Sequence, residues 1–159
     1  MRSIGVLLGG LALAAPASAA SFYAAGFSGA YTQAVALGPS NEVVACRAAA
    51  ALGEGLAVRI ERWANHDGLR VVLTSDRTFD VHMVPVDALA DGRRFDLPRA
   101  VDDGPDGVDA VGAVAVRLTP EAEAALVTAD RPALDAQGYE MPLPWGLAGA
   151  VRFLARCGA

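Results

Sequence analysis

The chain has 159 residues, of which 53% are hydrophobic, and its 13 basic and 18 acidic side chains give a formal charge of −5. This length and apolar content are typical of one folded domain with one core and exclude a disordered chain. All 13 basic residues are arginine, which excludes mechanisms that need lysine, such as a phosphate-binding loop, a Schiff base or a Ser-x-x-Lys dyad. The acidic balance, without basic clusters, also argues against nucleic acid as a partner.

The first 20 residues show the order of features expected of a secretory signal peptide. Arg2 supplies a positive charge, residues 4–15 form a short apolar run, Pro16 interrupts it, and residues 17–19 match the small-x-small cleavage pattern. We predict a signal peptide over residues 1–19, with cleavage one residue later as an alternative, and a single β-rich domain over residues 20–159. The competing interpretation is a buried N-terminal helix. No later run is long enough for a membrane span, so we expect a periplasmic or secreted protein without one.

Alternation of apolar and polar residues predicts most of the remaining elements as strands. The clearest case is a hairpin, in which residues 56–62 and 69–74 alternate on either side of an Asp67-Gly68 turn. The prolines of the last strand place it at a sheet edge. The predicted strands are residues 42–46, 56–62, 69–74, 79–84, 94–98, 111–118 and 139–144.

Two helices are predicted late in the chain. Thr119 and Pro120 are a capping hydroxyl and a first-turn proline, and they begin a helix that ends near residue 129. The second helix covers residues 146–156 and carries an apolar stripe that Cys157 continues. The sequence therefore predicts a mainly β (α+β) fold, an antiparallel β-sandwich or partly open barrel of about seven short strands with a C-terminal helix.

The two cysteines predict a single disulfide. Cys46 ends a predicted strand, Cys157 follows the last helix, and an exported chain folds where disulfides persist. A metal site is disfavoured because the two cysteines and two histidines lack ligand spacing, and a catalytic cysteine is disfavoured by the compartment. We therefore predict a Cys46–Cys157 bridge.

The sequence contains no recognisable set of catalytic residues. Residues 26–29 (Gly-Phe-Ser-Gly) resemble a nucleophile elbow, but Ala30 replaces the required glycine, so we interpret them as a glycine-rich loop before the first strand. Triads that use Ser40 or Ser75 with a histidine are not suggested by any spacing. His66 falls in the hairpin turn, where an exposed imidazole is ordinary.

Two metal hypotheses arise, each with a more ordinary alternative. Asp80 and His82 share one strand face and could hold a metal or act as a base with its orienting group; the alternative is a solvated strand face. A group of aspartates could bind calcium but lacks the ligand order, and the alternative is a solvated acidic loop. We therefore assign no catalytic, cofactor-binding or metal residue. The aspartates of that loop are Asp102, Asp103, Asp106 and Asp109.

The two tryptophans are candidates for either the core or a binding surface. The alternation places the Trp63 side chain on the face of the strand opposite to that of Ile60, next to a turn, and both interpretations stay open for it. For Trp145, between Pro144 and the last helix, we favour the core.

Several short motifs resemble a known group of proteins. Residues 26–31 (Gly-Phe-Ser-Gly-Ala-Tyr) precede Cys46, and residues 147–149 (Leu-Ala-Gly) precede Cys157. This layout resembles small uncharacterised exported proteobacterial proteins and is faintly similar to the invasion-associated locus B type. The resemblance implies a β-rich periplasmic domain and carries no catalytic residues.

These observations favour a non-catalytic exported β-domain of the cell envelope that binds a partner protein, of envelope or host origin, or a small ligand. The alternatives are a periplasmic hydrolase with a Ser/His/acid site assembled by the fold, and a metal-binding module. We expect no cofactor.

Overall fold

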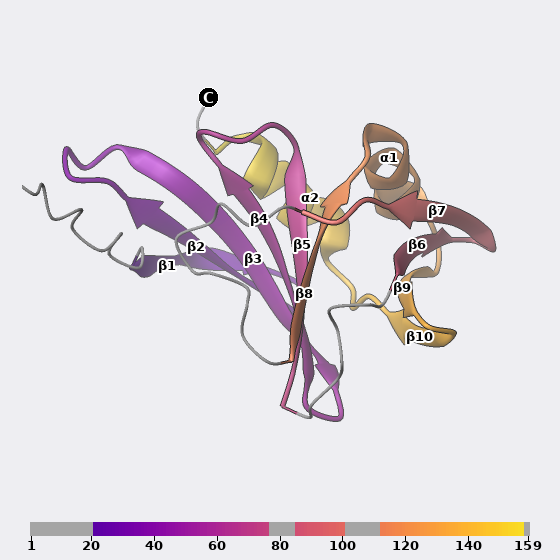
Figure 1. The fold of residues 1–159 in the computed structure, drawn as a ribbon. Coiled ribbons are helices and arrows are strands. Elements are labelled where there is room, and N and C mark those ends of the chain that lie inside the picture. The colour runs from indigo at the N-terminus through magenta and orange to yellow at the C-terminus, as the bar shows by residue number, and fades with distance from the viewer. Residues whose placement is uncertain (1–20, 77–84, 101–111, 158–159) are drawn as a thin grey trace, which may run out of the picture.

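The computed structural model describes residues 21–76, 85–100 and 112–157. These residues form two antiparallel sheets and two short helices (Figure 1). The larger sheet has the strand order β1-β2-β3-β4-β5-β8, so its first five strands form a meander and β8 returns to the far edge. Its strands are β1 (Phe22–Ser28), β2 (Tyr31–Leu37), β3 (Val43–Gly53), β4 (Leu56–Trp63), β5 (Leu69–Ser75) and β8 (Ala113–Leu118).

The smaller sheet has the order β10-β9-β6-β7 and joins the larger one through β8. The Arg117 amide donates to the Pro98 carbonyl at 2.8 Å, and the Ala100 amide donates to the Ala115 carbonyl at 3.0 Å. The smaller sheet is therefore anchored along one edge of the larger sheet. Its strands are β6 (Val86–Ala90), β7 (Arg93–Leu97), β9 (Pro132–Ala136) and β10 (Tyr139–Pro142).

Both helices begin where the sequence predicts. Helix α1 (Pro120–Thr128) is capped by Thr119, whose hydroxyl accepts a bond from the Ala122 amide at 3.2 Å. Helix α2 (Leu147–Ala155) buries the predicted stripe against strands β1 to β4. The smaller sheet and α1 lie toward the other side of the molecule, beside β8 (Figure 1).

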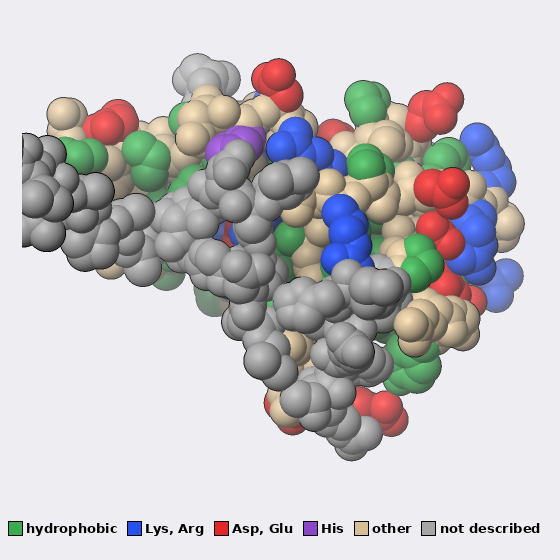
Figure 2. Space-filling model, in the orientation of Figure 1, with side chains coloured by type: hydrophobic (Ala, Val, Ile, Leu, Met, Phe, Trp, Pro, Cys, Tyr) green, Lys and Arg blue, Asp and Glu red, His purple; other side chains and the backbone are tan. Residues whose placement is uncertain are grey.

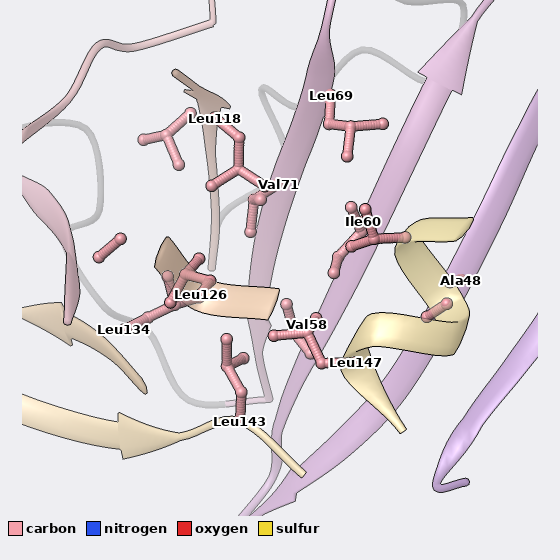
Figure 3. Close-up of a cluster of buried hydrophobic side chains, with 14 of the residues drawn as sticks. Ala48, Val58, Ile60, Leu69, Val71, Leu118, Leu126, Leu134, Leu143 and Leu147 are labelled. Carbon is pink, nitrogen blue, oxygen red and sulfur yellow. The ribbon is translucent and has the colours of Figure 1, made fainter. Parts of the chain in front are cut away.

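One apolar core lies between these layers. Strands β4 and β5 each present alternate residues to it, as the hairpin periodicity predicts. Helix side chains and the inward residues of the smaller sheet complete the core, and Figure 3 shows Leu126, Leu143 and Leu147 pointing toward Val58 and Val71.

The disulfide between Cys46 and Cys157 is present and joins the middle of the larger sheet to the end of α2. The two Cα atoms are 6.0 Å apart, and Cys46 is buried. The predicted pairing is therefore confirmed, and so is the orientation of the apolar stripe that leads to Cys157.

The interpretation of residues 26–29 as a loop is wrong, because they belong to the β1–β2 hairpin. Gly26 follows a β-bulge and Gly29 forms the turn, so these glycines shape a strand pair. The hairpin docks against the start of α2. The Ser28 hydroxyl donates to the Gly146 carbonyl at 2.8 Å, and the Ala30 amide donates to the Trp145 carbonyl at 3.1 Å.

Close packing explains the glycines in and next to the motifs at residues 26–31 and 147–149. A Cβ on Gly146 would lie 2.2 Å from the Ser28 carbonyl oxygen, and one on Gly149 would lie 2.0 Å from the Ser28 hydroxyl. Gly146 also has a φ of 99°, a region that side chains disfavour. Residues 26–31 and 147–149 are therefore the two halves of one packing contact.

The fold class is confirmed as mainly β, with antiparallel sheets and a C-terminal helix. The described strands close no barrel, because β1 and β8 end the larger sheet. The number of strands is larger than predicted. Periodicity missed β1, β2, β6 and β9, whereas β10 lies at a sheet edge as its prolines predict. The predicted strand over residues 79–84 lies outside the described residues.

Candidate functional site

A cleft opens between the larger sheet and the β9–β10 hairpin. Its cavity volume is about 40 Å³. Its floor is apolar and comes from five strands, β4, β5, β8, β9 and β10. The apolar residues are Leu56, Leu73, Val114, Ala136 and Met141.

Two tight hairpin turns border this cleft. Glu54 and Gly55 turn β3 into β4 with positive φ angles of 52° and 76°, and the Gly55 carbonyl accepts from the Asp76 amide at 3.1 Å. Gln137 and Gly138 turn β9 into β10 in the same manner. The sequence therefore places one turn on the larger sheet and one on the smaller sheet.

The polar groups of the cleft gather at its mouth. Thr74 and Ser75 end β5, and Gln137 and Tyr139 come from the opposite hairpin. The Tyr139 hydroxyl donates to a Glu54 carboxylate oxygen at 3.2 Å, which joins the two hairpins beside the mouth. An apolar floor with a polar rim suits a molecule that buries an apolar part and leaves a polar end near water.

The serine and histidine candidates do not form a catalytic set in the described part of the chain. The Ser28 hydroxyl donates to the Gly146 carbonyl, whereas His66 lies in the turn between β4 and β5. The His66 Nδ1 lies 2.8 Å from the Asn65 side-chain oxygen. Ser40 lies in a turn where its amide donates to Glu42 at 2.9 Å. Ser75 reaches the cleft through its position at the end of β5.

The two metal hypotheses are not tested by the structure. Asp80, His82 and the aspartates of residues 102–109 lie outside the described residues. Among residues 21–76, 85–100 and 112–157, no three His, Cys, Asp or Glu side chains are grouped to hold a metal ion.

The outer face of the smaller sheet carries charges of both signs. Asp87 pairs across the strands with both Asp135 and Asp96, and Asp135 pairs with Glu140. The Arg94 guanidinium bonds to Asp87 and lies 3.4 Å from Asp135, and hydrogen bonds to Asp87 and then Asp135 raise the pKa of Arg94. Figure 2 shows blue and red side chains mixed at this end of the molecule, where Figure 1 places β6 and β7. Arg94 offsets part of the acidic charge on this face.

The two tryptophans have opposite environments. Trp63 is buried on the sheet face away from the main core, where its ring meets Phe22 edge to face at 6.1 Å. The core interpretation of Trp145 is wrong, because its side chain is 78% exposed. The main chain of Trp145 is used for the contact with Ala30, and its ring lies beside Gly29 at the surface.

A buried carboxylate on this second sheet face was missed by sequence reasoning. Glu61 is fully buried and accepts hydrogen bonds from Arg47 Nε at 2.8 Å and from Trp63 Nε1 at 3.2 Å. Arg59 and Arg70 also lie within 3.7 Å of its oxygens. In the sequence, Glu61 alternates with apolar residues like any solvent-facing position. The strand pairing that places Arg47 and Arg70 beside it is a tertiary feature.

Comparison with known proteins finds no match among protein-family models, curated proteins or solved structures. The resemblance to small exported proteobacterial proteins therefore stays a prediction. Neither described helix has the length and apolar character needed to cross a membrane.

Proposed function

We propose that this chain is a non-catalytic, exported binding module that holds a small apolar molecule in the cleft between its two sheets. The observation that carries the proposal is the composition of the cleft, whose floor is apolar and whose polar groups are confined to the rim. The N-terminal pattern and the disulfide support export, since disulfides persist in oxidising compartments. The periplasm or the extracellular medium is the proposed location.

The test uses a fluorescent apolar probe and one matched pair of variants. The oxidised chain without residues 1–19 is titrated with N-phenyl-1-naphthylamine, an uncharged dye whose emission rises in apolar sites. Leu56→Asp places a charge on the cleft floor, whereas Leu37→Asp changes an exposed leucine on β2 that is outside the cleft. We expect Leu56→Asp to weaken probe binding about tenfold or more, since burying an unpaired carboxylate is unfavourable.

Leu37→Asp should leave probe binding unchanged. Urea unfolding of both variants shows that each is folded under the assay conditions. If the wild-type chain binds no probe, or if both variants bind as the wild type does, the cleft is not a binding site and the proposal is refuted.

A further inference from the structure

The two turns that border the cleft are occupied by unusual residues. Four of the described residues other than glycine have a positive φ, and two of these, Asn41 and Asp91, have the short polar side chains that this backbone region tolerates. The other two are Glu54 and Gln137, with φ angles of 52° and 56°. Tight hairpin turns favour asparagine, aspartate or glycine at such positions. The turns beside the cleft therefore carry longer polar side chains than the turns themselves favour, and such positions occur at ligand sites.

The cleft is acidic where it meets the β3–β4 turn. Glu54 lies in this turn, and a Cβ on Gly55 would collide with the carboxylate of Asp76, so a second acid packs against the same turn. The described residues that line the cleft itself include no charged side chain. At the lower end of the face in Figure 2, where Figure 1 places this turn, red side chains are visible and blue ones are not. A cation at this position would be attracted, whereas a carboxylate or phosphate would be repelled.

The polar groups at the mouth suit a ligand that donates hydrogen bonds. Tyr139 lines the cleft, and its hydroxyl donates to a Glu54 carboxylate oxygen at 3.2 Å. A carboxylate accepts several hydrogen bonds, so Glu54 can accept one from a ligand as well. Thr74 and Gln137 offer further oxygen acceptors at the rim, and an aromatic ring such as that of Tyr139 attracts a cation to its face. An ammonium group, which only donates, matches this set of acceptors.

The volume of the cleft limits the apolar part of the ligand. A cavity of about 40 Å³ equals the space of about three or four waters, at roughly 10–15 Å³ for each. This space suits a short alkyl group of about four carbons, and a larger molecule would keep the rest of itself in the mouth. Leu56, Leu73 and Met141 supply the apolar surface that such a group would cover.

From these observations we infer that the ligand is a small alkylammonium compound, whose alkyl group lies on the apolar floor of the cleft and whose charged nitrogen is held at the mouth by Glu54. The inference rests on the proposed function and adds the charge and the size of the ligand. The ammonium group donates to the Glu54 carboxylate and to the side-chain oxygen of Gln137.

The experiment compares three compounds that share an isobutyl group and differ in charge. At neutral pH isobutylamine is positive, isobutanol is uncharged and 3-methylbutanoate is negative. Each compound is used to displace N-phenyl-1-naphthylamine from the oxidised chain at low salt, where charge interactions are least screened. We expect isobutylamine to displace the dye at a concentration about tenfold lower than isobutanol does, and 3-methylbutanoate to be the weakest of the three.

Glu54→Gln removes the charge of the proposed partner and keeps its size. It should weaken the binding of isobutylamine about tenfold and leave that of isobutanol unchanged, since only the amine uses the charge. Glu140→Gln is the matched control. Glu140 follows Tyr139 on β10, so its side chain points to the opposite face of the strand, and the variant removes the same charge away from the cleft. The control should change the binding of neither compound, and unchanged binding of isobutanol shows that each variant is folded.

Failure of the inference and failure of the proposed function give different results. If the dye binds in the cleft but isobutylamine displaces it no better than isobutanol, the inference is overturned and the cleft remains a site for an uncharged apolar molecule. The inference is also overturned if Glu54→Gln and Glu140→Gln have equal effects, or if Glu54→Gln weakens the amine and the alcohol alike. If the dye itself does not bind in the cleft, the proposed function is refuted instead.

Discussion

Replacing Cys46 with serine should lower the free energy of unfolding by about 4–5 kcal/mol. The bridge joins residues 111 apart, and the chain-entropy relation gives about 4.8 kcal/mol at 25 °C for a loop of this length. For a chain of this size each kcal/mol changes the melting temperature by roughly 3–4 °C, so the midpoint should fall by roughly 15 °C. The effect comes mainly from the unfolded chain, which regains conformations that the bridge forbids.

Urea unfolding of four proteins tests this prediction: wild type, Cys46→Ser, Cys157→Ser and the double variant. Both single variants and the double variant should lose the same stability, because each loses the same bridge. The reduced wild type is the matched control and should unfold with the variants. If the two single losses add in the double variant, the cysteines do not form one bond. Uptake of iodoacetamide by the unreduced, unfolded wild type would also refute the pairing.

Two other substitutions test contacts that hold the larger sheet and α2. Glu61→Gln should lower the free energy of unfolding by urea by about 3 kcal/mol, because the arginines beside it lose their buried charge partner. The control Glu140→Gln changes an exposed carboxylate and should alter the free energy of unfolding by less than about 0.5 kcal/mol. If the two variants lose the same stability, the charge of Glu61 is unimportant. Gly146→Ala should cost at least about 2 kcal/mol, because a positive φ and a clash with the Ser28 carbonyl act together. Gly92→Ala has a similar φ of 83° with open space around its Cβ and should cost only about 1 kcal/mol, so an equal loss would contradict the role of packing at Gly146.

Local patterns predicted the parts of the fold that local chemistry controls. The β4–β5 hairpin follows from alternation and an Asp-Gly turn, and α1 follows from the cap of Thr119 and the proline behind it. The disulfide could be predicted because an exported chain with two cysteines has one intramolecular pairing. In each case a few neighbouring residues, or a simple count, decide the structure.

The features that local patterns missed depend on residues distant in the sequence. Alanine and glycine weaken the alternation of β1, so its strand character comes from pairing with β2 and docking on α2. Glu61 reads as a solvated residue until β3 and β5 bring arginines to both sides of it. The cleft is lined by residues as far apart in the sequence as Leu56 and Met141, and no spacing in the sequence predicts that they meet.

The same distant contacts explain why the cleft opens where it does. Helix α2 is held at both ends, by the Ser28–Gly146 contact at its start and by the disulfide at its end. The small residues between them, such as Ala48 and Ala150, are fully buried and let the helix approach the sheet closely. The smaller sheet is instead bound along β8, and its far hairpin reaches the β3–β4 turn through the Tyr139–Glu54 hydrogen bond between exposed side chains. An exposed bond of this kind contributes little to stability, whereas the disulfide and the docked hairpin hold α2 firmly against the larger sheet.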